Sequence, residues 1–346
     1  MQVESEDTIA VAGAPALPGL VFRHFRGPAD YAGLAAAGNA SREADGNDWV
    51  AGAEDVAVQY EHLENCDLAT DIVIAEGHGE IIGFVRGQWL REATGLYSYA
   101  FALGLVPAWR GHGVRRAMLR WAEARLRQVA ADHPAGAPKV YTTGAPQVAA
   151  GLVALLESEG YRPDRYFYKM VRSLAEPIPD FPLPPGLELR PVRPEQYRPI
   201  WDASHEAFRD HWGYSPWSEE EYERWLKEPV QFMPALWQVA WDVERDEIAG
   251  QIQTYIDARE NEKFARRRGY TEGISVRRSY RRRGLARAMI AASLRTLKAH
   301  GMTESALNVD AESLTGAMRL YEACGFVVDE TYVAYRKPLD APVAWP

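Results

Sequence analysis

The sequence of 346 residues contains only two cysteines, Cys66 and Cys324, and no run of apolar residues long enough to span a membrane. Two cysteines exclude a disulfide framework, and their scarcity is typical of a reducing compartment. No His and Cys residues occur at the spacing of a zinc site, so we expect no metal. These absences predict a cytoplasmic globular protein.

The chain also lacks an excess of positive charge. It carries 39 Lys and Arg residues against 48 Asp and Glu residues, which gives a net charge of −9. A protein that binds nucleic acid is usually basic, so the charge balance argues against a nucleic-acid partner. An acidic surface is compatible with a cationic amine as the substrate, although net charge affects steering rather than identity.

Two segments lack the pattern of regular structure. Residues 1–18 have neither the basic region nor the apolar core of a secretory signal, and we expect a disordered N-terminal lead. Residues 175–186 contain five prolines, which exclude a helix or a central strand. They are predicted to form a linker between a domain at 19–174 and a domain at 187–346.

The two halves of the chain repeat one order of predicted elements. Each half has a strand, two helices, three strands, a loop with a helix, a strand, a helix and a final strand; residues 259–269 are predicted to be a charged loop. Corresponding positions keep a nearly constant separation, as in the pairs Leu20 and Leu187, Leu105 and Val276, Gly113 and Gly284, and Gly160 and Gly325. Repetition at this length indicates two copies of one domain.

The most informative stretch is residues 276–288. A predicted strand ends at Val276, and a helical apolar pattern begins near Ala286. Between them the sequence reads Arg281-x-x-Gly284-x-Ala286. Backbone N–H groups at such a turn can converge on an anion at the helix N-terminus, where the helix dipole also favours negative charge.

This pattern resembles the pyrophosphate loop of the GNAT superfamily of N-acetyltransferases, which bind acetyl-coenzyme A (acetyl-CoA). The resemblance extends over nearly the whole chain and is closest to the tandem two-domain type. It implies an α/β (α+β) fold with two GNAT domains, each a mixed, mostly antiparallel sheet flanked by helices. It also implies acetyl-CoA as the cosubstrate.

The resemblance gives roles to residues of the second copy. Glu272 is expected to be the general base, on the same strand face as Val276 if no bulge intervenes. Tyr321, in Leu320-Tyr321-x-x-x-Gly325-Phe326, is expected to protonate the departing thiolate. The alternatives are a surface carboxylate and a packed aromatic ring, and Cys324 is interpreted as buried packing. The expected acetyl-CoA contacts are Ile274, Ser275, Val276, Arg281, Arg282, Arg283, Gly284, Leu285, Ala286, Arg287, Asn308 and Ser313.

The acceptor pocket is expected beside the connection between the first two helices of the second copy, at residues 211–220. Aromatic rings and carboxylates there suit a cationic amine. The candidates are Trp212, Tyr214, Trp217 and Glu219. The same residues are equally compatible with packing between domains.

The first copy lacks the expected chemistry. It keeps Arg110 and Gly113 but has Arg115 where the second copy has Ala286. Phe101 is aligned with Glu272, and Leu156 with Tyr321. A long side chain at 115 should hinder a phosphate, so the first copy is predicted to be degenerate.

The predicted function is direct transfer of an acetyl group from acetyl-CoA to a primary amine of a small molecule, in the second copy. One alternative is a non-catalytic acyl-CoA sensor that regulates a partner. Another is an enzyme like the tRNA-dependent aminoacyl transferases, in which Arg266–Arg268 and Arg277–Arg283 would contact RNA. No membrane contact is expected, and the chain is expected to be a monomer or a homodimer.

Overall fold

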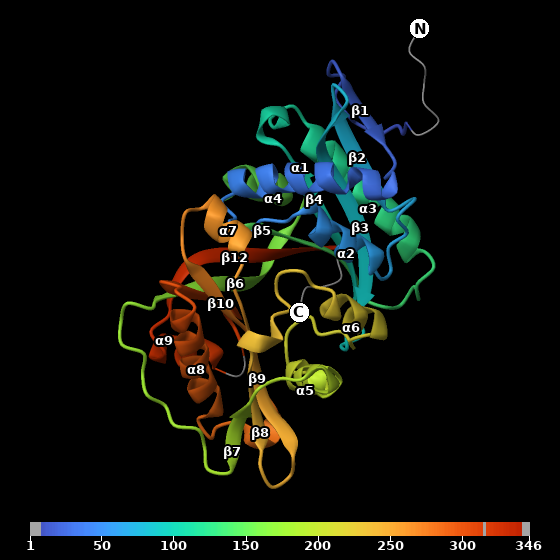
Figure 1. Ribbon diagram of the computed structural model, residues 1–346. Coiled ribbons are helices and arrows are strands. Elements are labelled where there is room, and N and C mark those ends of the chain that lie inside the picture. Colours follow the sequence, from blue (N-terminus) through green and yellow to red (C-terminus); the bar gives the residue numbers. More distant parts are fainter. Residues whose placement is uncertain (1–7, 314–315, 341–346) are drawn as a thin grey trace. The chain divides into compact units, whose positions relative to one another are not determined.

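The computed structural model describes residues 8–313 and 316–340. The chain forms two compact units, of which the first contains the residues up to Asp164 and those from Val333 onward (Figure 1). The second unit is Arg165–Tyr332. None of the helices in the described ranges is long and apolar enough to cross a membrane.

The two sequence repeats exchange their last strands between the units. Strand β6 (Arg162–Ser173) ends the first repeat, yet it pairs antiparallel with β11 (Glu304–Asp310) of the second. Strand β12 (Val327–Pro338) ends the second repeat, and its C-terminal part lies beside β5 (Lys139–Pro146) in the first unit. Each unit is therefore completed by a strand that the linear repeat assigns to the other.

The first unit has a mixed sheet with the strand order β1-β2-β3-β4-β5 and then β12. The neighbouring pairs up to β4 are antiparallel, and β4 is parallel to β5. Its other elements are β1 (Leu20–Arg23), α1 (Tyr31–Ala44), α2 (Ala53–Glu61), β2 (Ile72–Gly77), β3 (Glu80–Arg91), β4 (Tyr97–Leu105), α3 (Val114–Ala130) and α4 (Ala150–Ser158).

The second unit repeats this arrangement with the strand order β6-β11-β10-β9-β8-β7. Helix α8 covers the face that carries Ala240 and Ala249, and α5 covers the opposite face with Val239 and Ile248. Its other elements are β7 (Leu187–Arg190), α5 (Tyr197–Phe208), α6 (Glu219–Leu226), β8 (Gln238–Asp242), β9 (Glu247–Tyr255), α7 (Ala258–Lys263), β10 (Arg268–Val276), α8 (Leu285–Ala299) and α9 (Ala317–Ala323). The predicted mixed, mostly antiparallel sheets flanked by helices are confirmed.

Two local predictions were wrong. The charged loop predicted at 259–269 contains helix α7, which begins after Asp257; the Asp257 side chain accepts from the N–H groups of Arg259 and Glu260 at 2.9 and 3.1 Å. This cap stabilises a helix too short to give a periodic pattern. Residues 1–7 of the predicted disordered lead lie outside the described residues, but Thr8 bridges to Arg23 and Val11 is buried.

Candidate active site

The loop before α8 turns the backbone so that N–H groups converge. Arg282 and Gly284 both have left-handed backbone angles, with φ of 62° and 87°, and α8 begins at Leu285 without a side-chain cap. The N–H groups of the first helical turn therefore have no carbonyl partner within the helix. Together with the dipole of a 15-residue helix, they form a site suited to a phosphate oxygen.

The Arg281 side chain holds this loop in place rather than pointing at an anion. Its Nε donates to the Val276 carbonyl at 3.0 Å, and its two terminal nitrogens donate to Asp210 at 2.8 Å and to the Ala207 carbonyl at 2.9 Å. Arg278 also bonds to Asp210, and the two guanidinium groups lower the pKa of that carboxyl to about 2. These three bonds occupy most of the guanidinium N–H groups of Arg281.

Three other arginines leave positive charge at the loop. Within the described ranges, no carboxylate pairs with Arg282, Arg283 or Arg287. The Arg283 guanidinium lies 5.5 Å from the centre of the Tyr280 ring, and that of Arg287 lies 5.1 Å from the Phe181 ring. These side chains could neutralise phosphate charge without first breaking an ion pair.

A bulge in β10 changes which face its residues occupy. The register with β9 shifts between Glu272, opposite Gln253, and Ser275, opposite Gln251; Gly273 in the bulge has a φ of 59°. Glu272 was expected to share a face with Val276 only if no bulge intervened, and this condition is not met. Thr271 bonds to Ser293 of α8, so Glu272 lies on the other face of β10, whereas the Val276 side chain packs with the cluster under α8.

Strands β10 and β11 separate just before this bulge. Their parallel pairing runs only from Arg268, opposite Glu304, to Tyr270, opposite Ala306. The N–H of Arg277 bonds to the Ala249 carbonyl of β9 at 3.0 Å. Because successive N–H groups point to opposite edges of a strand, the Val276 N–H points to the open edge. An extended ligand can add to β10 there.

A cavity of about 1190 Å³ occupies the gap between the strands and reaches the loop before α8. It brings together both predicted catalytic residues and every predicted acetyl-CoA contact. The lining residues include Glu272, Tyr321, Ile274, Ser275, Val276, Arg281, Arg282, Arg283, Gly284, Leu285, Ala286, Arg287, Asn308 and Ser313.

The Glu272 carboxylate is half-buried and receives several hydrogen bonds. The backbone N–H and the side-chain amide of Asn308 both donate to Oε1, at 2.7 and 2.8 Å, and the Gly273 N–H donates as well. Burial outweighs these bonds and raises the pKa of Glu272 to about 7. A carboxyl group with this pKa can accept and release a proton near neutrality.

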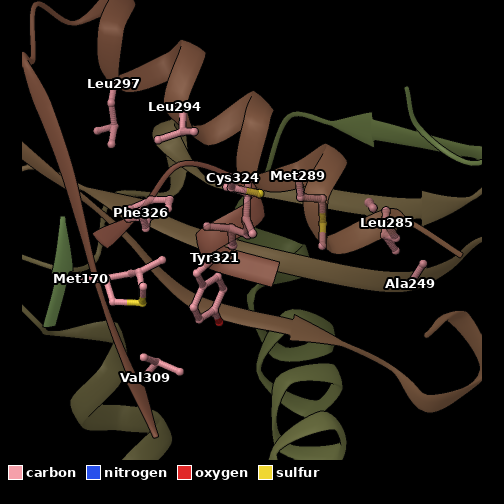
Figure 2. Close-up of a cluster of buried hydrophobic side chains, with 14 of the residues drawn as sticks. Met170, Ala249, Leu285, Met289, Leu294, Leu297, Val309, Tyr321, Cys324 and Phe326 are labelled. Carbon is pink, nitrogen blue, oxygen red and sulfur yellow. The ribbon is translucent and has the colours of Figure 1, made fainter. Parts of the chain in front are cut away.

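Tyr321 is held by the apolar cluster under α8. Figure 2 shows its ring extending from α9, with the hydroxyl oxygen at the end farther from Cys324 and Met289. Burial, and secondarily the charge of Glu272, raises the pKa of Tyr321 far above its ordinary value, so the phenol remains a donor. Burial raises the pKa of the Cys324 thiol to about 11, and the residue is 1% exposed. Cys324 is therefore packing, not a nucleophile.

The four residues predicted to bind the acceptor do not line this cavity. Tyr214 bonds to His205, Trp217 lies against Trp201 and His205, and Glu219 pairs with Arg198. Trp212 is in contact with Phe167, their ring centres 6.0 Å apart. Their packing lies within the second unit, so the acceptor role stays a prediction without support from the cavity.

Further residues line this cavity. They include Phe167, Phe208, His211 and Asp310. Sequence reasoning missed Phe167 because it belongs to the first repeat and reaches the second unit only through the strand exchange. His211 lies 4.3 Å from Phe208, ring centre to ring centre, and its pKa is lowered by burial. The only signal for it was its position at the start of the 211–220 connection.

In the first unit, Arg115 bonds to two side chains of the region that corresponds to the cavity of the second unit. Its guanidinium donates to Asp45 at 2.9 Å and to Ser41 at 3.2 Å. Arg110 bonds to Asp45, Ser41 and the Leu105 carbonyl, as Arg281 bonds to Asp210, Ala207 and Val276. Asp45 thus corresponds to Asp210, and Arg115 corresponds to Ala286. In the first unit a buried ion pair therefore fills the space that stays open beside Ala286 in the second unit.

The bulge also changes the counterpart of Glu272 in the first unit. Gly83 lies opposite Leu105 as Gly250 lies opposite Val276. Three residues further along, Arg86 lies opposite Ala102, whereas Gln253 lies opposite Glu272. The alignment of Glu272 with Phe101 was therefore wrong by one residue, and Ala102 is the counterpart.

The alignment of Leu156 with Tyr321 is supported because their backbone carbonyls accept equivalent hydrogen bonds. The Leu156 carbonyl accepts from the N–H of Tyr161, as the Tyr321 carbonyl accepts from that of Phe326. With Ala102 and Leu156 at these two positions, the first unit has no side chain there that can move a proton.

The profile of the Acetyltransferase (GNAT) family matches this chain twice, at residues 40–149 and 198–326. Among curated proteins, a mycothiol acetyltransferase of Salinispora tropica is 31% identical over 237 residues, which are 68% of this chain and 71% of that protein.

Two of the solved structures that share the fold cover nearly the whole chain. A GCN5-related N-acetyltransferase from Sphaerobacter thermophilus has a TM-score of 0.68 and 28% identity, covering 96% of this chain and 99% of that one. A tandem GNAT protein from the clavulanic acid biosynthesis pathway has a TM-score of 0.63 over 94% of this chain and 100% of its own, but is only 14% identical and indicates fold alone. These matches confirm the resemblance read from the loop and the repeat.

Proposed function

This chain belongs to the GNAT family of acetyltransferases, and from that premise we propose that its second unit transfers an acetyl group from acetyl-CoA to a primary amine of a small molecule. The observation that carries the proposal is the cavity of the second unit. It combines an anion-binding loop, an open strand edge, a carboxyl group with a pKa near 7 and a protonated phenol.

The cavity suits acetyl-CoA by its shape and by its donors. The loop before α8 would hold the pyrophosphate through first-turn N–H groups, with Arg282, Arg283 and Arg287 neutralising charge. Ala286 keeps the approach open. The free edge of β10 would pair with the pantetheine amides, and the Val276 N–H would donate to the thioester oxygen as negative charge develops there.

Glu272 would prepare the acceptor. An amine arrives largely as an ammonium ion, and its nitrogen becomes nucleophilic only after losing a proton. Ionised Glu272 would take that proton directly or through one water. The free amine then attacks the thioester carbon, a C–N bond forms and the C–S bond breaks. The products are an N-acetyl amide and the coenzyme A thiol.

Tyr321 would stabilise the departing sulfur. The pKa of a thiol is about 8.5, well below that of this phenol, so a hydrogen bond from Tyr321 to the developing thiolate is favoured over early complete transfer. The nitrogen loses a second proton as the amide forms, and this proton balances the one that finally appears on the thiol. The first proton, which Glu272 took from the ammonium ion, is released to solvent.

The arginine-rich segment offers little support for a tRNA-dependent reaction. Arg277 pairs with Glu206 and Glu247, and Arg278 and Arg281 pair with Asp210. RNA phosphates would have to displace these carboxylates. The charge balance of the chain points the same way.

The proposal is tested by measuring thiol release from acetyl-CoA with a panel of amines, with mass spectrometry of the products. The panel should include the acceptor of the mycothiol acetyltransferases, amino acids, aminoglycosides and peptides. We expect thiol release that depends on one amine class, together with an amine product heavier by one acetyl group. Binding of acetyl-CoA without transfer to any amine would instead favour the acyl-CoA sensor.

A further inference from the structure

Asn308 contacts Glu272 in a way that its sequence position did not predict. It lies on β11, and the resemblance suggested a contact with acetyl-CoA. In the structure, its backbone N–H and its side-chain amide both reach Glu272 Oε1, at 2.7 and 2.8 Å. One residue thus supplies two donors to one carboxylate oxygen.

The separation of the strands explains this contact. Parallel pairing of β10 and β11 ends at Tyr270 and Ala306, and Glu272 and Asn308 lie two residues further along each strand. The backbone N–H of Asn308 therefore has no ladder partner on β10 at this point, and the Glu272 carboxylate accepts from it instead. The pair lies where the cavity opens, and both residues line the cavity.

The surroundings of Glu272 otherwise disfavour its charge. Burial is the largest influence and raises its pKa. Tyr321 of α9 and Tyr255 of β9 lie close enough for the charge of Glu272 to raise their own pKa values. Among the residues that the structure describes, no Lys or Arg forms an ion pair with Glu272. Asn308 and the Gly273 N–H are its hydrogen-bond donors.

We propose that Asn308 is a positioning residue that favours the ionised form of Glu272 and fixes its orientation toward the cavity. This inference rests on the proposed function, because it supposes that Glu272 is the base. Asn308 acts through Glu272 and has no chemical step of its own. Its removal should therefore change the pH dependence of the reaction rather than the affinity for acetyl-CoA.

The first measurement is the pH profile of kcat/KM for Asn308→Ala. Loss of the side-chain donor should move the acid limb of the profile upward by about one pH unit, since a hydrogen bond to a charged group stabilises it by roughly that much. At pH 7 the variant should be about fivefold slower, and at pH 9 nearly as fast as the unchanged protein. Asn308→Asp should move the limb further, because two carboxylates would then share one site.

A double-mutant cycle separates positioning from acetyl-CoA binding. In the Glu272→Gln background, Asn308→Ala should cause little further loss of kcat/KM, because both changes remove the same function. If Asn308 instead binds acetyl-CoA, the losses multiply and the Kd of acetyl-CoA rises. That result would overturn the inference.

A direct titration of the Glu272 carboxyl tests the inference without requiring acetyl transfer. The side-chain carboxyl of Glu272 can be followed by ¹³C NMR in the full chain, and assigned by its absence in Glu272→Gln. The inference predicts that Asn308→Ala raises its pKa by about one unit, even if no amine is acetylated. An unchanged titration would contradict the role of Asn308, whereas inactivity toward every amine would contradict only the proposed function.

Discussion

Tyr321→Phe should lower kcat by about 10²- to 10³-fold while the Kd of acetyl-CoA stays nearly unchanged. The substitution removes one oxygen and keeps the ring that packs in the cluster under α8. The lost hydrogen bond is strongest when the sulfur carries developing charge, so the loss falls on the transition state. Steady-state kinetics with the amine found in the thiol-release screen, together with calorimetric titration of acetyl-CoA, measures both quantities.

The matched control is Tyr332→Phe. Tyr332 belongs to the same unit, is 41% exposed and does not line the cavity, so its substitution should leave kcat unchanged. A Tyr321→Phe variant with normal kcat and weaker acetyl-CoA binding would show that Tyr321 only shapes the cavity.

Glu272→Gln should lower kcat/KM by about 10²-fold and abolish the acid limb of its pH profile. The unchanged protein should gain activity as pH rises through about 7, the pKa of Glu272, because only the ionised carboxyl can accept a proton. Glutamine keeps an oxygen that can accept from Asn308 but cannot act as the base. The profile is measured from pH 5 to 9 with acetyl-CoA at saturation.

The same substitution should stabilise the fold at neutral and alkaline pH. An unfolded glutamate has a pKa of about 4.3, while that of folded Glu272 is about 7. The folded state therefore binds the proton more tightly, and the unfavourable contribution of this group grows between these two values as pH rises. Thermal unfolding at pH 8 should give Glu272→Gln a Tm at or above that of the unchanged protein.

Glu322→Gln is the control for the base. Glu322 is exposed beside Tyr321 in the sequence and does not line the cavity. Its substitution should change neither the acid limb nor the Tm. If Glu272→Gln retains a normal acid limb, another group is the base, and His211 is the next residue to test because it lines the same cavity.

The local parts of this site were predictable because short-range chemistry determines them. The turn at Gly284 and the small Ala286 follow from the needs of an anion at a helix N-terminus. The side-chain positions on β10 were harder, since one extra residue reverses every face beyond it. Gly273 was the available signal, because an isolated glycine within a strand pattern often marks a bulge.

The strand exchange could not be predicted from the sequence. Strands β6 and β12 occupy the same place in their repeats. The sequence pattern of neither strand shows whether it pairs with β5 or with β11. Phe167 therefore lines the cavity of the second unit although it belongs to the first sequence repeat. The contact of Asn308 with Glu272 depends on where β10 and β11 part, which is a property of the folded sheet.

We expect the second unit alone to bind acetyl-CoA, and isothermal titration of the Ala286→Arg variant tests this claim. The unchanged chain should bind one acetyl-CoA. Ala286→Arg should weaken binding by at least about 100-fold, since an arginine there can pair with Asp210 as Arg115 pairs with Asp45. Arg115→Ala, in the first unit, should leave the affinity of the second unit unchanged. Two equal sites per chain, or full affinity in Ala286→Arg, would contradict the claim.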